Sequence, residues 1–121
     1  MTKYEVKESL SKYYKECCSV ECLKKRIEIL RASNMDESEI NGRIEELTES
    51  LKKAVLNEDF ALATALELIN KLNNADFDVD VLKKYHIEGL SEKTIAKQLH
   101  LSVDYIRKKR WRAYEKISKI K

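Results

Sequence analysis

The scarcity of helix-breaking residues most constrains how this chain can fold. Its 121 residues include no proline and only two glycines, Gly42 and Gly89. Proline removes a backbone donor and glycine costs conformational entropy, so both tend to interrupt helices. Charged residues make up 37% of the chain, and Glu, Lys, Leu and Ala, which favour helix, are abundant. We therefore predict an all-α protein without a sheet.

The charge is distributed unevenly along the chain. Residues 83–121 contain 12 Lys and Arg against 4 Asp and Glu, whereas residues 1–82 contain 12 against 17. Charged surface helices could produce some imbalance, but such a separation of sign favours two parts with different roles. The basic part is expected to bind a polyanion, and the acidic part is expected to do something else.

Several classes of protein are not indicated by the sequence. It has no apolar run of membrane-spanning length and no apolar leader, so we expect a cytoplasmic protein without a membrane partner. It has no Gly-rich phosphate loop, no His-Glu metal helix and no activated Ser or Cys arrangement. We therefore expect no enzyme activity, no catalytic residues and no cofactor.

Three cysteines raise the question of a metal site. Cys18 and Cys22 are four residues apart and could face one zinc ion from a helix. However, the spacing of a zinc knuckle is absent, and His86 and His100 lie far away in sequence. We expect reduced thiols, with Cys17 filling a helix seam as a small apolar side chain, and no bound metal.

Residues 1–75 show two periodic apolar stripes with spacings of mainly three and four. The stripes cover residues 3–32 and 43–72, and the polar stretch 33–42, with Gly42, is expected to form the loop between them. Residues 60–68 are apolar on several faces and should be buried on more than one side. We predict an antiparallel, coiled-coil-like helical hairpin, followed by Asp76 or Asp78 as the cap of the next helix.

Residues 76–121 contain three shorter helical patterns separated by two sharp turns. Gly89 is placed to end the first helix in a left-handed conformation. Ser91 and Ser102 are placed to cap the helices 92–99 and 103 to about 120, with residues 100–102 as the turn. Inward-facing side chains are expected at Leu82, Tyr85, Ile87, Ile95, Ala96, Leu99, Leu101, Ile106, Ala113, Ile117 and Ile120. This spacing predicts a helix-turn-helix.

The segment 85–106 resembles the fourth conserved region of bacterial sigma factors. The matching positions are Glu88-Gly89-Leu90-Ser91, Ile95-Ala96, Leu99, Leu101-Ser102-Val103 and Ile106, and Ala113 and Ile117 extend the pattern. The layout of the chain is similar to that of the ArpU/RinA-like late activators of phages and prophages. The resemblance implies control of transcription in a bacterial cell or phage-infected host. Two positions depart from it, because His100 stands where a Gly is usual and Arg110 where Leu is usual.

Recognition helices contact bases through their N-terminal turns, which here carry Asp104, Tyr105 and Lys108. Asp accepts from cytosine and Lys donates to guanine, so we expect these three side chains to reach base edges. Alternatively, Tyr105 and Trp111 pack against the N-terminal hairpin. Phosphate contacts are expected from Thr94, Ser102, Arg107, Lys109, Arg110 and Arg112.

We therefore expect a sequence-specific regulator of transcription that binds double-stranded DNA. The hairpin would either form a homodimer, which supplies a second half-site, or contact RNA polymerase, or satisfy itself within a monomer. The rival hypothesis is an adaptor whose sigma-like module binds RNA polymerase without specific DNA binding. A third hypothesis is DNA packaging, although small terminase subunits usually carry their helix-turn-helix near the N-terminus.

Overall fold

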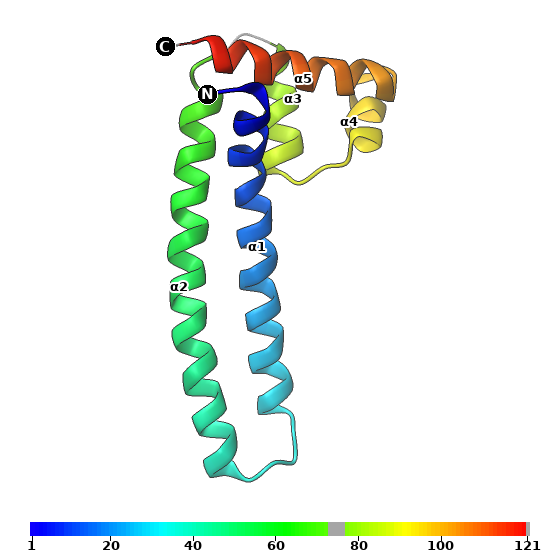
Figure 1. The fold of residues 1–121 in the computed structure, drawn as a ribbon. Helices are drawn as coiled ribbons and strands as arrows, with labels where there is room; N and C mark the ends of the chain where they lie inside the picture. The colour runs from blue at the N-terminus through cyan, green and yellow to red at the C-terminus, as the bar shows by residue number, and fades with distance from the viewer. Residues whose placement is uncertain (73–76, 121) are drawn as a thin grey trace. The chain divides into compact units, whose positions relative to one another are not determined.

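The protein is all-α (Figure 1). The computed structural model describes residues 1–72 and 77–120, which contain no strand. No helix within these ranges is both long and apolar enough to cross a membrane. The elements are α1 (Lys3–Arg31), α2 (Glu37–Ile69), α3 (Phe77–Leu82), the π-helical segment η1 (Lys83–Ile87), α4 (Glu92–Leu99) and α5 (Val103–Lys119).

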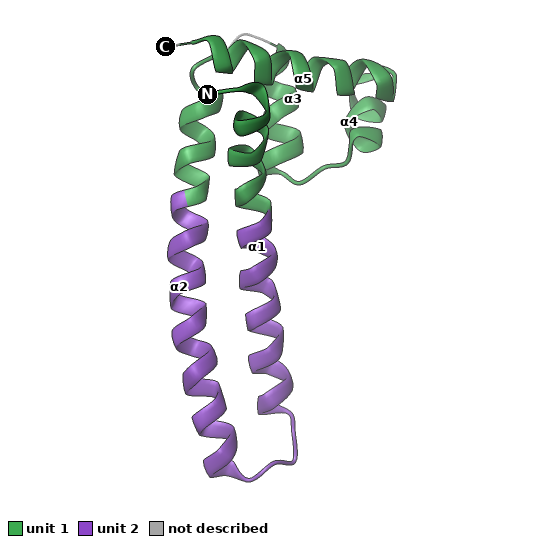
Figure 2. Ribbon diagram, viewed as in Figure 1, with its two compact units in different colours: residues 1–14, 61–121 green, residues 15–60 purple. Residues whose placement is uncertain are grey.

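The chain divides into two compact units (Figure 2). Unit 1 consists of residues 1–14 and 61–121, and unit 2 consists of residues 15–60. The predicted domain boundary between residues 75 and 76 lies outside the described residues. Unit 1 therefore combines the first turns of α1 and the last turns of α2 with all of the shorter helices.

Unit 2 is a pair of helical segments joined by residues 32–36. The predicted loop 33–42 is too long, because α2 begins at Glu37 and the Ile40 N–H donates to the Asp36 carbonyl at 2.9 Å. Two acidic residues in the first turn, Glu37 and Glu39, interact favourably with the helix dipole and help to start the helix early. A Cβ atom at Gly42 would meet nothing within 4 Å, so this glycine occupies an ordinary exposed helical position.

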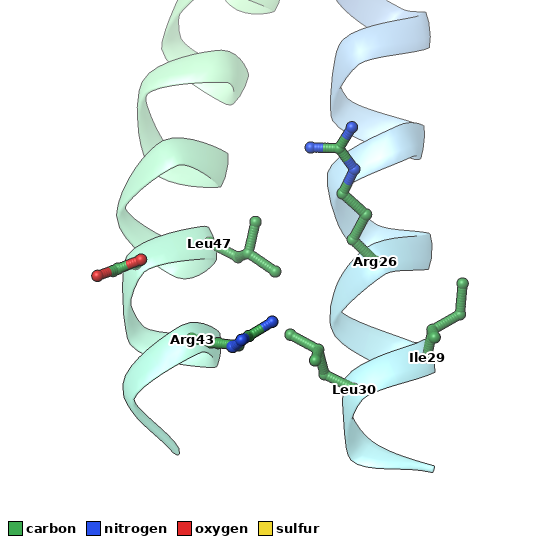
Figure 3. Close-up of a pocket in the computed structure, with 6 residues that line it drawn as sticks. Arg26, Ile29, Leu30, Arg43 and Leu47 are labelled. Carbon is green, nitrogen blue, oxygen red and sulfur yellow. The ribbon is translucent and has the colours of Figure 1, made fainter. Parts of the chain in front are cut away.

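The seam of unit 2 is thin. Its buried apolar side chains are Val20, Ile27 and Ala54, whereas Leu56 and Phe60 are 69% and 76% exposed. The prediction of burial on several sides is thus wrong at Phe60, because this side chain leaves the helix on its outer face. An open pocket of about 440 Å³ interrupts the seam (Figure 3), and it is lined by Arg26, Ile29, Leu30, Arg43, Glu46 and Leu47.

The larger core of unit 1 joins its two terminal helix segments to α3 and α5. Val6 and Leu10 of α1 are fully buried in it. Tyr114 of α5 is also fully buried and is the largest side chain in this cluster. The cluster is completed by Ala65, Leu68, Ile69, Leu72, Val79, Leu82, Ala113 and Ile117. Burial on this scale fixes which faces of α1 and α5 remain open to solvent.

A second cluster in unit 1 consists of Val81, Ile95, Ala96 and Ile106, and it joins α3, α4 and α5. The burial predicted for Ile95, Ala96 and Ile106 is confirmed. The inward positions predicted for Leu101 and Ile120 are wrong, because these side chains are 38% and 40% exposed. Leu101 follows the left-handed residue that ends α4, and Ile120 lies beyond the last turn of α5.

The predicted helix cap at Asp78 is also wrong. This residue lies inside the first turn of α3, where its carboxylate is fully buried and accepts a 2.8 Å hydrogen bond from Lys116 Nζ. The alternative cap, Asp76, lies outside the described residues. Asp78 therefore ties α3 to α5 within unit 1.

Candidate nucleic-acid interface

The connection from η1 through α4 to α5 follows the predicted turn chemistry. Gly89 has a φ of 72° and His100 has a φ of 57°, so both adopt the left-handed conformation. Ser91 Oγ accepts a hydrogen bond from the N–H of Thr94, and Ser102 Oγ accepts one from the N–H of Tyr105, both at 3.1 Å. These caps fix where α4 and α5 begin. The prediction of α4 at residues 92–99 is confirmed.

One face of α5 is buried and the opposite face is exposed. Ile106, Ala113 and Ile117 lie in the core, whereas Asp104, Lys108 and Arg112 follow one another at intervals of four on the open face. Lys108 Nζ and an Asp104 carboxylate oxygen form a 3.1 Å ion pair in which both side chains are largely exposed. Such a pair contributes little stability, so either partner is available to a ligand at low cost.

Tyr105 and Lys109 flank this open face on the side of α3. Tyr105 is 42% exposed, and its ring lies 6.5 Å from that of Phe77 in a tilted arrangement. Lys109 Nζ lies 5.5 Å from the Tyr105 ring centroid and 3.9 Å from Asp78 Oδ1, and only 18% of its side chain is exposed. Tyr105 thus keeps an accessible edge, while Lys109 is largely occupied by contacts within the protein.

Arg110 does not present its charge on the open face. It is 6% exposed, and its guanidinium lies 4.1 Å from the Tyr85 ring centroid. One guanidinium nitrogen donates to Tyr114 Oη at 3.0 Å and the other pairs with Glu92 Oε2 at 3.3 Å. Because both terminal guanidinium nitrogens are paired inside unit 1 and the side chain is buried, Arg110 is not among the candidate phosphate contacts. It occupies the position where the sigma-like pattern carries Leu.

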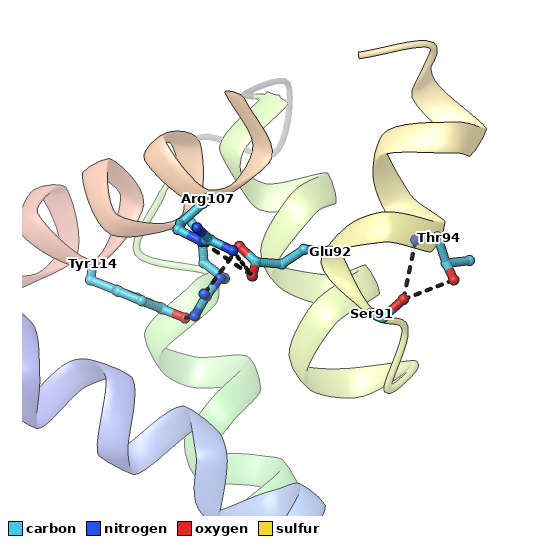
Figure 4. A network of polar contacts seen from close by, with 6 residues as sticks. Ser91, Glu92, Thr94, Arg107 and Tyr114 are labelled. Atoms are coloured by element: carbon cyan, nitrogen blue, oxygen red, sulfur yellow. Dashed lines mark hydrogen bonds and ion pairs between the residues drawn. The ribbon is translucent and has the colours of Figure 1, made fainter. Parts of the chain in front are cut away.

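Arg110 belongs to a partly buried polar network with Glu92, Arg107 and Tyr114, and the last three are labelled in Figure 4. Glu92 Oε1 also pairs with Arg107 at 3.4 Å, so one carboxylate of α4 holds two arginines of α5. On the other side, Tyr114 Oη lies 2.6 Å from His86 Nε2. Tyr114 Oη accepts from Arg110, and it can donate its own proton to a neutral His86 in the tautomer whose Nε2 carries no hydrogen.

Burial explains the titration of both ring side chains in this network. Burial, followed by the positive charges of Arg110 and Lys7, lowers the pKa of His86 to about 3. Burial also raises the pKa of Tyr114 to about 12. Both groups are therefore neutral at pH 7, which suits a hydrogen-bonded chain inside a core.

Trp111 lies on the other flank of the open face and packs against α1. Its ring lies 5.7 Å from that of Tyr4 in an edge-to-face arrangement, and 5.3 Å from that of Tyr114. The alternative prediction was that Trp111 packs against the N-terminal hairpin, and its contact with Tyr4 of α1 agrees with this. Thr94 and Ser102 both remain exposed at the starts of their helices, and the Thr94 hydroxyl lies 2.9 Å from that of Ser91.

The exposed surface of α4 and α5 is predominantly positive. Asp104 and Glu115 are its exposed acidic residues within residues 92–119. The exposed basic residues of the same range are Lys93, Lys97, Arg107, Lys108, Arg112 and Lys119. This surface has the charge that attracts a polyanion, with a few apolar and hydroxyl groups at the start of α5.

Sequence reasoning missed the residues that hold this surface in place. The Glu92–Arg107 and His86–Tyr114 contacts join residues that are 15 and 28 positions apart, so no local pattern shows them. Cys17 is half-buried, and Cys18 and Cys22 are exposed. Within residues 1–72 and 77–120, no group of three or more His, Cys, Asp or Glu side chains is arranged to hold a metal.

Comparison with known proteins gives no relative. No family model matches the chain, and no curated protein and no solved structure matches it. The resemblance to the fourth sigma region therefore depends on the motif residues alone.

Proposed function

We propose that this chain is a sequence-specific DNA-binding regulator of transcription that inserts the N-terminal turns of α5 into the major groove. The proposal depends chiefly on one observation. Two capped helices meet across a three-residue turn, and the second helix carries Asp104, Lys108 and Arg112 on the face opposite its buried side. A helix so supported can enter the major groove, which is about 12 Å wide.

The roles proposed for the side chains follow from their exposure. Asp104, Tyr105 and Lys108 are proposed to contact base edges, because they are exposed in the first two turns of α5. The proposed phosphate contacts are Arg107, Arg112, Thr94 and Ser102, which are all exposed. The Glu92 carboxylate would hold the Arg107 side chain until a DNA phosphate takes the place of the carboxylate, since their 3.4 Å ion pair is partly open to solvent.

The test is a DNA-binding measurement with variants of α5. Fragments selected by the protein from a bacterial genomic library would provide a bound site, and binding to it would be followed by fluorescence anisotropy at several salt concentrations. Lys108→Ala should weaken specific binding by about 1–3 kcal/mol and relax the preference at one position. Arg112→Ala should weaken binding to all sequences and lower the salt slope by about one unit.

A matched control is Lys52→Ala on α2, which removes an exposed, ion-paired lysine from unit 2. It should leave affinity and salt slope unchanged. If Lys108→Ala and Arg112→Ala both bind like the parent protein, α5 is not the recognition helix. If the parent protein binds no DNA even at low salt, the result favours the rival adaptor that contacts RNA polymerase.

Unit 2 is proposed to mediate self-association or contact with RNA polymerase. Its seam buries few side chains, and the large apolar side chains of Ile29, Leu56 and Phe60 are exposed. A homodimer would present two copies of α5 to two half-sites. Size-exclusion chromatography of the full chain with light scattering gives its molar mass and so distinguishes a dimer from a monomer. A monomer at micromolar concentration would argue against the dimer.

A further inference from the structure

The N-terminal end of α1 lies directly beside α5 within unit 1. Tyr4 contacts Trp111 edge-to-face at 5.7 Å, and Lys7 Nζ lies 5.1 Å from the centroid of the Trp111 ring. Lys3 Nζ lies 5.4 Å from the centroid of the Tyr4 ring. Lys3, Tyr4, Lys7 and Trp111 therefore form one aromatic and basic cluster, which we call the α1 cluster.

The position of the α1 cluster is fixed by its surroundings. Val6 and Leu10 are fully buried, which sets the rotation of α1 about its axis. At the start of the helix, the Glu5 N–H donates to Thr2 Oγ1 and the Thr2 N–H donates to Glu5 Oε1. This reciprocal capping box keeps the first turn formed, so Lys3 projects from an ordered helix.

The charges of this part of α1 are segregated by face. Glu5, Glu8 and Lys12 line an open pocket together with Met1 and Ser9. By contrast, Lys3 and Lys7 are four positions apart and contact aromatic rings of the α1 cluster. A positive patch therefore lies beside α5, although residues 1–82 are acidic as a whole.

The α1 cluster borders the open face of α5. Trp111 is one helical turn from Arg107 and Lys108, which is about 5 Å along the axis. A helix with its side chains is about 10–12 Å across and nearly fills the major groove, so groups beside it face the phosphates that border the groove. Lysines in this position would meet a phosphate strand.

We propose that Lys3 and Lys7 are phosphate contacts of the same DNA-binding surface, so that the interface includes the start of α1 as well as α4 and α5. This inference rests on the proposed function. The Tyr4 and Trp111 rings hold the two ammonium groups near α5 by cation–π attraction and reduce the entropy lost on binding. The contacts are sequence-independent, because phosphates carry no base information.

The experiment compares Lys3→Gln/Lys7→Gln with Lys12→Gln in the full chain. Lys12 lies on the same helix and is exposed, but it lines the pocket with the acidic residues. The double variant should lower the salt slope of DNA binding by about two units, which corresponds to at most roughly a 30-fold loss of affinity at 0.15 M salt. The ratio of specific to nonspecific affinity should not change, and Lys12→Gln should bind like the parent.

A charge-preserving variant controls for an effect on folding. Lys3→Arg/Lys7→Arg keeps both positive charges and should retain the parental slope. If the double Gln variant keeps the parental slope while Arg112→Ala still lowers it, the inference is wrong and the proposed function stands. If the parent protein does not bind DNA at low salt, both fail together.

Discussion

Acidification should destabilise unit 1 through His86, whose imidazole is buried and neutral. In the folded chain the pKa of His86 is lowered to about 3 by burial and by the charges of Arg110 and Lys7. In the unfolded chain it returns to about 6.5. Between these values the unfolded state binds a proton that the folded state does not, so stability falls as the pH is lowered from 6.5 towards 3. Above pH 7 this contribution is complete.

The size of the effect follows from the two pKa values. Each pH unit below 6.5 lowers the free energy of unfolding by about 1.4 kcal/mol. A change from pH 7 to pH 5 should therefore lower it by about 2 kcal/mol. For a chain of this length the unfolding entropy is about 0.25 kcal/mol per degree, which converts this loss into a midpoint shift of about 8 °C. The 3% exposure of His86 leaves little solvent screening to reduce this figure.

The assay is thermal unfolding at pH 7, 6 and 5, followed by the fluorescence of Trp111. This is the one tryptophan of the sequence, and it lies in unit 1. His86→Gln is the informative variant, because an amide oxygen can accept the Tyr114 hydrogen bond but does not titrate. We expect its midpoint to fall by about 8 °C less than that of the parent between pH 7 and pH 5.

His100→Gln is the matched control, because it replaces the other histidine of the sequence, whose side chain is exposed rather than buried. The carboxylates are common to all three proteins, so their titration cancels when the variants are compared. Parallel pH profiles for the parent and His86→Gln would show that burial does not keep His86 neutral, and the reasoning would then be refuted.

Three further predictions, which use five substitutions, concern how α4 and α5 are held together. Glu92→Gln should lower the free energy of unfolding, measured with urea, by about 2 kcal/mol, because it leaves the buried guanidinium of Arg110 without its carboxylate partner. Asp104→Asn, which removes an exposed ion pair, should lower it by under about 0.5 kcal/mol. Equal losses in the two variants would contradict this. His100→Gly should raise stability by about 0.5–1 kcal/mol by relieving the positive φ, and a decrease would be evidence against strain. Ser91→Ala and Ser102→Ala should each cost about 1 kcal/mol in the same assay, and unchanged midpoints would show that the caps contribute nothing.

The features that could be predicted from the sequence depend on neighbouring residues. A Ser three positions before its N–H partner caps a helix whatever the rest of the fold does, and this holds for Ser91 and Ser102. The same is true of the left-handed conformations of Gly89 and His100, which end a helix locally. These local signals located α4 and the start of α5 to the residue.

Other features were missed because several weak preferences compete. Residues 37–42 include Ser, Asn and Gly, which favour turns, and this suggested a loop. Nevertheless, two acidic residues in the first turn of α2 and continuation into a long helix outweigh these preferences. Leu101 shows the opposite error, because a motif suggested burial where the backbone after His100 leaves the side chain partly exposed.

Charge along the chain is an incomplete guide to charge on the proposed binding surface. Residues 83–121 are strongly basic, but Arg110 is buried against Glu92, and Lys116 pairs with the buried Asp78 at 2.8 Å. These cations stabilise the packing of α5 and add little to the field that a phosphate would meet, because their carboxylate partners lie within a few ångströms. Conversely, Lys3 and Lys7 come from the acidic part of the chain and lie beside α5. If the proposed function is right, the electrostatic attraction for DNA should therefore depend on the exposed cations of α4, α5 and the start of α1, whichever part of the sequence supplies them.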